Sequence, residues 1–247
     1  MDKRATEVYG MPPDTLITYT SRIYKLGFLF AGIGLVQWII LAAINFHMDK
    51  LTADRYGWWL SCTFFAIATL AWTDVGRKFP FNIALTVCIV ESSTWYIAIE
   101  RSFIQNHLAD FYALVIVLAV VLCSIFWGAY FPMYVVPGDL LLSVLVAMAN
   151  IMLILFFFNA YITGAASVET AVRNYFALFA ISMITYTATI VHGRQFNVPK
   201  NEYLFLSVII FFCYMILHER VLALSAEYSN DLECTFLFNQ TTYIRIF

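Results

Sequence analysis

Long apolar runs separated by short polar breaks repeat along this 247-residue sequence. The runs are about 17 to 24 residues long, and a helix needs about 20 apolar residues to cross the ~30 Å hydrocarbon core of a bilayer. Hydrophobic residues make up 62% of the chain and charged residues only 12%, which is about half the charge of a typical soluble domain. The alternating pattern of membrane-barrel strands does not occur. The sequence therefore predicts an all-α integral membrane protein with one membrane domain.

The positions of these runs predict a bundle of seven transmembrane helices. They cover Leu26–Phe46, Tyr56–Trp72, Phe81–Ile99, Phe111–Phe131, Leu140–Tyr161, Tyr175–His192 and Tyr203–Leu224. We expect a polar N-terminal segment (1–25), a multispanning membrane domain (26–224) and a C-terminal tail (225–247) outside the membrane. Basic residues in the leading segment favour an N-terminus on the cytoplasmic side.

The last apolar run is the ambiguous one, because it is uninterrupted only from Tyr203 to Leu217. A helix of that length spans about 22 Å, which is short of the ~30 Å core. A full crossing must pass the charged residues 218–220. This charged turn either anchors the helix at the membrane interface, or the segment is short and re-entrant.

Charge and cysteine content exclude several classes of partner and cofactor. The net charge is −2 and no basic block exists, so nucleic acid is not an expected partner; the lipid bilayer is. No CxxC spacing occurs, and we expect neither a zinc site, nor a disulfide framework, nor a cofactor. The cysteines inside apolar runs are interpreted as small buried hydrophobic residues; they are Cys62, Cys88, Cys123 and Cys213.

Glu91 is the acidic residue deepest in any apolar run. A carboxylate within a membrane span is costly and usually faces a cavity or a partner. One interpretation is a cation ligand or proton acceptor that lines an internal path. The other is a hydrogen-bonded glutamate that ties helices together, helped by the neighbouring hydroxyls of residues 92–94.

The sixth predicted span carries a polar face formed by Ser182, Thr185, Thr189 and His192. Spacings of three and four residues place these side chains on one side of a helix. They could form the hydrophilic wall of an ion path, with His192 as a titrating group at its mouth. Alternatively, the hydroxyls bond carbonyls of their own helix or cross-link neighbouring spans.

The motifs of intramembrane catalysis do not occur in this sequence. No aspartate falls inside an apolar run, so a pair of membrane-buried aspartates is missing. Neither a Gly-x-Ser-x-Gly elbow nor a His-Glu-x-x-His motif is present. We therefore expect that the protein is not an enzyme.

Several short motifs, in this order and spacing, are similar to those of one membrane-protein family. They are Tyr19–Leu26, Gln37, Arg77–Asn82, Glu91, Asp139, Tyr175–Gly193 and Asn201–Phe205. On these residues the chain resembles the transmembrane Bax-inhibitor-motif family, in particular its lifeguard branch. The resemblance extends over nearly the whole chain after Asp14.

The resemblance implies one departure from the family's pattern. The family carries an aspartate in its sixth helix and another in its seventh, and this acid pair gates a calcium leak in response to pH. The matching positions here are Thr187 and Cys213. A hydroxyl and a thiol neither share a proton as carboxylates do nor bind Ca²⁺ strongly. We therefore expect that the pH-gating acid pair is lost and that the protein does not respond to acid.

Two functions follow from the resemblance. The first is a calcium-leak channel or regulator of intracellular Ca²⁺ and apoptosis, with Ca²⁺ as the transported ion. The second is a non-conducting protein that modulates partner membrane proteins, such as regulators of cell death. The resemblance implies a multi-pass protein of the endoplasmic reticulum or Golgi, with the plasma membrane as the alternative.

Overall fold

The computed structural model describes residues 13–44, 57–73, 78–102, 107–194 and 203–244. In these ranges every regular element is a helix and no strand forms, which confirms the predicted all-α class. The elements are α2 (Pro13–Ala43), α4 (Gly57–Trp72), α5 (Phe81–Ser102), α6 (His107–Tyr130), α7 (Asp139–Phe158), the π-helical turn η2 (Asn159–Thr163), α8 (Ala166–Val191) and α9 (Tyr203–Ile244).

Six helices of the described chain are long and apolar enough to cross a bilayer, so the protein is a multi-pass membrane protein. The predicted count of seven spans is not confirmed, because α4 has only 16 residues in the described chain. The last span, in contrast, is continuous from Tyr203 to Ser225. The re-entrant alternative for this segment is therefore wrong: α9 passes straight through residues 218–220.

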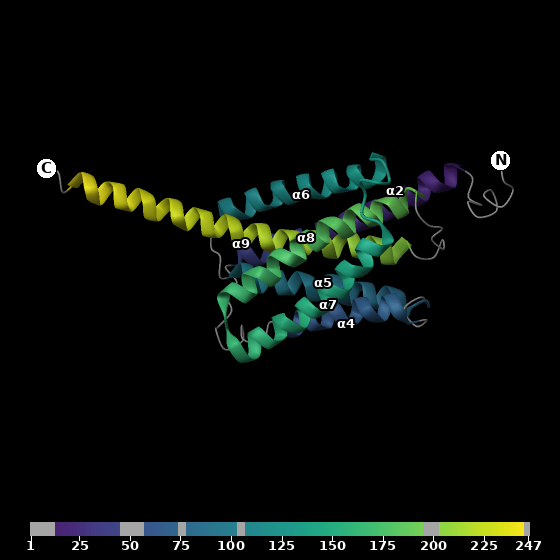
Figure 1. Ribbon diagram of the computed structural model, residues 1–247, viewed down its shortest axis with the longest axis horizontal. Coiled ribbons are helices and arrows are strands. Elements are labelled where there is room, and N and C mark those ends of the chain that lie inside the picture. Colours follow the sequence, from purple (N-terminus) through teal and green to yellow (C-terminus); the bar gives the residue numbers. More distant parts are fainter. Residues whose placement is uncertain (1–12, 45–56, 74–77, 103–106, 195–202, 245–247) are drawn as a thin grey trace.

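Helix α9 occupies the centre of the bundle and packs against α2, α5, α6 and α8 (Figure 1). Of the apolar window of α9, 67% is buried inside the protein, against 6% of the window in α7. Helix α7 packs mainly against α8. The main hydrophobic core accordingly surrounds Phe211 of α9, with Trp38, Ile97, Val117 and Ile184 from the neighbouring helices.

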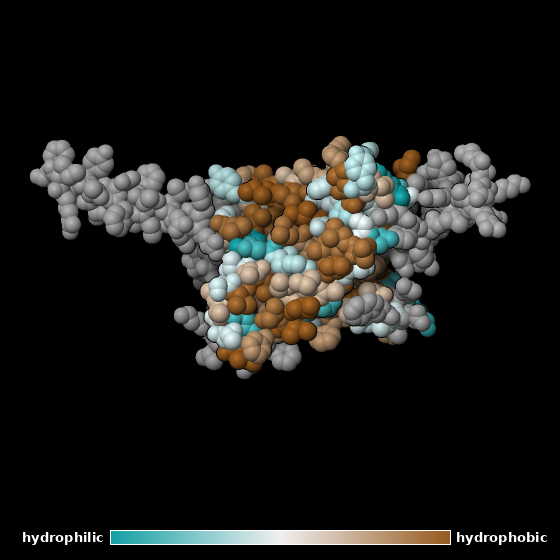
Figure 2. Space-filling model, in the orientation of Figure 1, coloured by the Kyte–Doolittle hydropathy of each residue, from teal (hydrophilic) through white to brown (hydrophobic). Residues whose placement is uncertain are grey.

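The outer face of the bundle is apolar, as expected for a surface that meets lipid acyl chains. Figure 2 shows hydrophobic side chains spread over this face, with smaller hydrophilic areas between them. Exposed leucine, isoleucine and phenylalanine side chains occur on every long helix. Of the four described cysteines, Cys213 is buried as predicted. The prediction is wrong for the other three, which lie exposed on this outer face.

Helices α6 and α8 approach each other closely at Gly128. A Cβ atom at this position would lie 2.1 Å from the carbonyl oxygen of Thr185 and 2.7 Å from Cβ of Ala188. Small residues permit such close backbone contact between membrane helices. Just beyond the contact, the Arg194 guanidinium donates to the carbonyl oxygens of Gly128 (2.8 Å) and Phe131 (2.5 Å), where a cation stabilises the C-terminus of α6.

Two predicted boundaries in the last third of the chain differ from the structure. Helix α8 begins at Ala166, so most of the predicted polar link at residues 162–174 is helical. Helix α9 continues through the predicted tail to Ile244, and its end projects from the bundle in Figure 1. The polar residues that suggested a link at 162–174 instead form contacts with α9, as described next.

Candidate functional site

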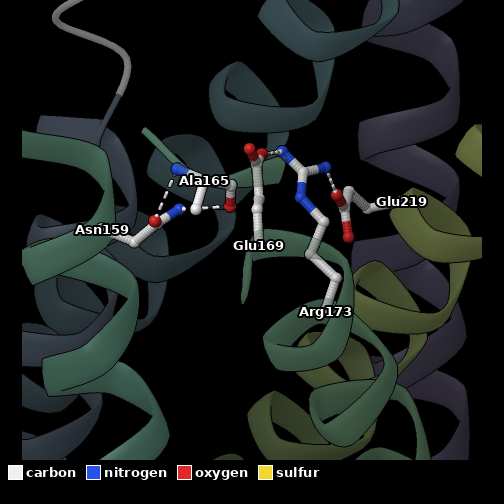
Figure 3. Close-up of polar contacts among 5 residues, drawn as sticks. All are labelled: Asn159, Ala165, Glu169, Arg173 and Glu219. Atoms are coloured by element: carbon white, nitrogen blue, oxygen red, sulfur yellow. Dashed lines mark hydrogen bonds and ion pairs between the residues drawn. The ribbon is translucent and has the colours of Figure 1, made fainter. Parts of the chain in front are cut away.

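The turn between α7 and α8 is held by the side chain of Asn159. Its amide nitrogen donates to the carbonyl oxygen of Ala165 (3.1 Å), and its oxygen accepts from the backbone N–H of Ala165 (2.9 Å) and the hydroxyl of Thr163 (2.6 Å). Gly164 takes a left-handed conformation with φ of 60°, which glycine adopts without steric cost. This turn fixes the N-terminus of α8, from which Glu169 and Arg173 project (Figure 3).

Arg173 of α8 binds two carboxylates at once (Figure 3). One bond goes to Glu169 in the same helix, at 2.6 Å from Nη2 to Oε1, and the other joins Nη1 to Glu219 of α9. The side chains of Arg173 and Glu219 are 13% and 10% exposed, whereas that of Glu169 is 39% exposed. Glu169 lies in the first turn of α8, where the helix dipole favours negative charge.

A second polar contact joins the same two helices one residue further along. Nε of Arg220 donates to the side-chain oxygen of Asn174 at 2.6 Å. The ring of His218 lies 4.6 Å from that of Trp38 in α2. Residues 218–220 are all buried, so these charged side chains pack inside the bundle; that they anchor α9 at the membrane interface stays a prediction. Residues 219 and 220 of α9 thus bind residues 173 and 174 of α8.

A small cavity lies beside this ion pair, among α4, α5, α7, α8 and α9. Arg173 and Glu219 line it together with the hydroxyl residues Thr63 and Ser93, and apolar side chains such as Phe176 form the rest of its wall. Its volume is about 60 Å³, which is large enough to hold water. The site therefore combines opposite charges, hydroxyls and room for water inside the bundle.

Glu91, which the sequence offered as a residue of an internal path, lies at a groove between α2 and α5. The groove has a volume of about 200 Å³ and is lined by Gln37, Ile40, Leu41, Glu91, Thr94, Trp95 and Ala98. Nε2 of Gln37 donates to Oε1 of Glu91 at 2.9 Å. This bond matches the helix-tying interpretation of Glu91. The neighbouring hydroxyls of Ser92, Ser93 and Thr94 bond carbonyls of their own helix, and the Ser92 hydroxyl also bonds that of Thr63 at 2.7 Å, which joins α5 to α4.

The polar face predicted on the sixth span is mainly a packing surface. The hydroxyls of Ser182, Thr185 and Thr189 donate to carbonyls of α8 itself, at 3.2, 2.9 and 2.7 Å. Thr185 and Thr189 are buried, and the backbone of Thr185 meets Gly128 of α6. These contacts match the alternative in which the hydroxyls bond their own helix, and the face does not border the cavity at Arg173.

His192, the fourth residue of this face, lies at the C-terminal end of α8. Its ring centroid is 6.0 Å from that of Tyr24 and 6.2 Å from that of Tyr130. Burial, and secondly the positive charge of Arg194, lower the pKa of the His192 imidazole below its ordinary value. The structure thus places His192 at the opposite end of α8 from Glu169 and Arg173.

Both positions that match the family's acid pair are buried. Thr187 and Cys213 are 1% and 2% exposed, and Cys213 belongs to the same core cluster as Ala180 and Ile184 of α8. A carboxylate nevertheless lies between these helices, since Glu219 follows Cys213 by six residues on α9 and binds Arg173 of α8. The expectation that the protein does not respond to acid assumed that no carboxylate lies between these helices, and that premise is wrong.

Fold and site together define a multi-pass, all-α membrane protein with a buried ion pair beside a cavity between its last two helices. A scan against protein-family models and searches of curated proteins and solved structures gave no match. Within the described ranges, no three His, Cys, Asp or Glu side chains gather in a group that could hold a metal ion.

The residues of the ion pair were missed because they stand in stretches that look like polar breaks. One signal could have found them: Glu169 and Arg173 have the i, i+4 spacing of a helical ion pair and directly precede an apolar run. That spacing extends the predicted helix backwards to residue 169. No local pattern could have identified Glu219 as the partner, because it lies 46 residues away in the sequence.

Proposed function

We propose that the protein is a Bax-inhibitor/lifeguard-like membrane protein that allows Ca²⁺ to leak across an internal membrane and thereby regulates intracellular Ca²⁺ and apoptosis. The membrane is that of the endoplasmic reticulum or Golgi, with the plasma membrane as the alternative. The protein acts as a transporter and not as an enzyme. In the absence of the family's acid pair, the ion pair of Arg173 and Glu219 takes over the control of the leak.

One observation carries this proposal: an arginine whose side chain is only 13% exposed binds two carboxylates, and it lines a cavity together with one of them, Glu219. Ionisable groups inside a membrane bundle mark ion paths more often than structural sites, because their burial is costly. The guanidinium repels cations while it occupies the carboxylates. When it is displaced, Glu169 and Glu219 are freed, and carboxylate oxygens are the ligands that Ca²⁺ prefers.

The same arrangement gives the closed state a physical cause. Glu219 belongs to the central helix α9, and Arg173 belongs to α8, which also holds α7. Breaking a buried ion pair costs several kcal/mol, so the bond opposes separation of α8 from α9 at the cavity.

Calcium efflux from liposomes that contain the purified full-length chain tests the proposal. The efflux rate should exceed that of protein-free liposomes at neutral pH. Efflux no faster than that of protein-free liposomes would overturn the leak function.

A second candidate function is that of a non-conducting protein that binds other membrane proteins. The position of Glu91 favours it, because this carboxylate lies at a lateral groove between α2 and α5 and not on the cavity wall. An acidic side chain at the outer face of a bundle is suited to a contact with another helix. Efflux indistinguishable from protein-free liposomes, together with recovery of a bound membrane protein that depends on Glu91, would favour this function.

A further inference from the structure

The groove between α2 and α5 is rigidly built. Nε1 of Trp38 donates to the carbonyl oxygen of Thr94 at 3.1 Å. A Cβ atom on Gly34 would lie 3.2 Å from the hydroxyl oxygen of Thr94, so the two helices are in close contact there. The groove opens about one turn away, at Gln37. Because these contacts fix both walls, a ligand meets a preformed site and little ordering cost opposes its binding.

Two side-chain oxygens of Glu91 and Gln37 in this groove can accept further hydrogen bonds. Oε1 of Glu91 accepts from the amide nitrogen of Gln37. Among the described residues, no donor bonds the second oxygen of Glu91 or the amide oxygen of Gln37. No cation of the described chain pairs with this carboxylate. The groove therefore offers two free acceptors, one of them negatively charged, and suits a cationic donor.

The depth of Glu91 decides which kind of cation can reach it. It stands near the middle of the apolar span Phe81–Ile99, where lipid headgroups do not penetrate. A lysine or arginine in the middle of another transmembrane helix does reach this depth. Such basic residues are themselves costly in lipid unless they are paired, so one contact offsets the cost of both charges.

The groove has the size and the lining for one long side chain. Its volume of about 200 Å³ exceeds the ~150 Å³ of a cavity that binds benzene. Ile40, Leu41 and Ala98 can cover the methylene groups of a lysine or arginine, while the Trp95 ring supplies an aromatic face for its charge. Ile33, Val36 and Val87 are exposed on the same two helices and offer apolar contact for the helix that carries this side chain.

We propose that the groove formed by Gln37 and Glu91 binds a transmembrane helix of another membrane protein through one lysine or arginine at mid-bilayer depth. This inference rests on the second candidate function and names the binding site and the partner's chemistry. It does not depend on the ion pair of Arg173, which lies at the cavity between α8 and α9.

The test uses the full-length protein in liposomes and a synthetic leucine-alanine transmembrane peptide with one central lysine. Matched peptides carry leucine at the centre, or the same lysine near one end. Fluorescence energy transfer between labelled peptide and protein should show at least tenfold tighter binding of the central-lysine peptide than of either control. The substitution Glu91→Gln should abolish this preference, and Glu91→Lys should transfer it to a peptide with a central glutamate.

Equal binding of the three peptides, or an unchanged preference in a folded Glu91→Gln variant, would overturn the proposal. A second result would also overturn the proposal: no peptide binds, and energy transfer occurs between two labelled copies of the protein but is lost in Glu91→Gln. That result would assign the groove to a second copy. Thermal melting of each variant verifies its fold. If a partner membrane protein is still recovered with the Glu91→Gln variant, the second candidate function stands and only the binding site at this groove is rejected.

Discussion

The two carboxylates that hold Arg173 contribute differently, because their exposure differs. Glu169 is 39% exposed, and ion pairs at a surface of this kind contribute little, at most about 1 kcal/mol. Glu219 is 10% exposed, and removal of one partner from a buried pair costs about 3–5 kcal/mol. The bond between Arg173 and Glu219 is therefore the one that resists opening, and Glu169 orients the guanidinium toward it.

His192 gives a residue-scale prediction about stability and pH. Because its pKa is lowered in the folded protein, the unfolded chain binds the proton more tightly. The free energy of unfolding therefore falls as the pH is lowered below about 6.5, the ordinary pKa of histidine, because the unfolded chain takes up the proton first. The melting temperature in detergent should fall between about pH 7.5 and about pH 5.5, and His192→Gln should reduce this fall. An equal fall in the variant would show that other groups cause it.

Glu91 and two threonines of α8 show what the sequence could and could not predict about single residues. The sequence correctly marked Glu91 as unusual, yet an acid in a span has the same local pattern whether it faces the interior or the lipid. The hydroxyls of Thr185 and Thr189 were placed on one face correctly by their spacing. Whether that face borders water or another helix depends on α6, whose contribution is a glycine with no polar signal.

At the scale of helices, apolar length predicted most of the structure. The limits of α5, α6 and α7 lie within a few residues of the predicted spans, because a bilayer-spanning helix must be apolar along its whole length. The start of α8 was wrong by nine residues, from 175 to 166. The charged residues at the start of α8 gave this stretch the composition of a loop. They are accommodated in a helix because α9 supplies a partner for Arg173.

The contact of α6 with α8 gives an element-scale prediction. Alanine forms helices better than glycine by about 1 kcal/mol, so Gly32→Ala, at a site with nothing within 4 Å, should raise the melting temperature slightly. Gly128→Ala should lower it by the equivalent of about 1–3 kcal/mol, because the added Cβ collides with the backbone of Thr185. Thermal melting in detergent compares the two variants. Equal stabilisation by both would contradict the close contact.

At the scale of the molecule, the central position of α9 connects the features described above. It contacts α2, α5, α6 and α8. A shift of α9 at Glu219 would therefore alter the packing of four other helices. The ion pair and its cavity lie inside, between α8 and α9, whereas the Gln37–Glu91 groove lies outside, between α2 and α5. The protein can therefore control a path at the first site and bind a partner at the second without one interfering with the other.

The central claim is that Arg173 keeps a calcium path closed, and the initial rate of Ca²⁺ efflux from liposomes tests it most directly. Arg173→Gln is compared with Arg220→Gln, because Arg220 also joins α8 to α9 but does not line the cavity. We expect Arg173→Gln to raise the rate at least severalfold over the unmodified protein and Arg220→Gln to leave it nearly unchanged. Equal rates for folded Arg173→Gln and the unmodified protein, or equal increases in both variants, would contradict the claim.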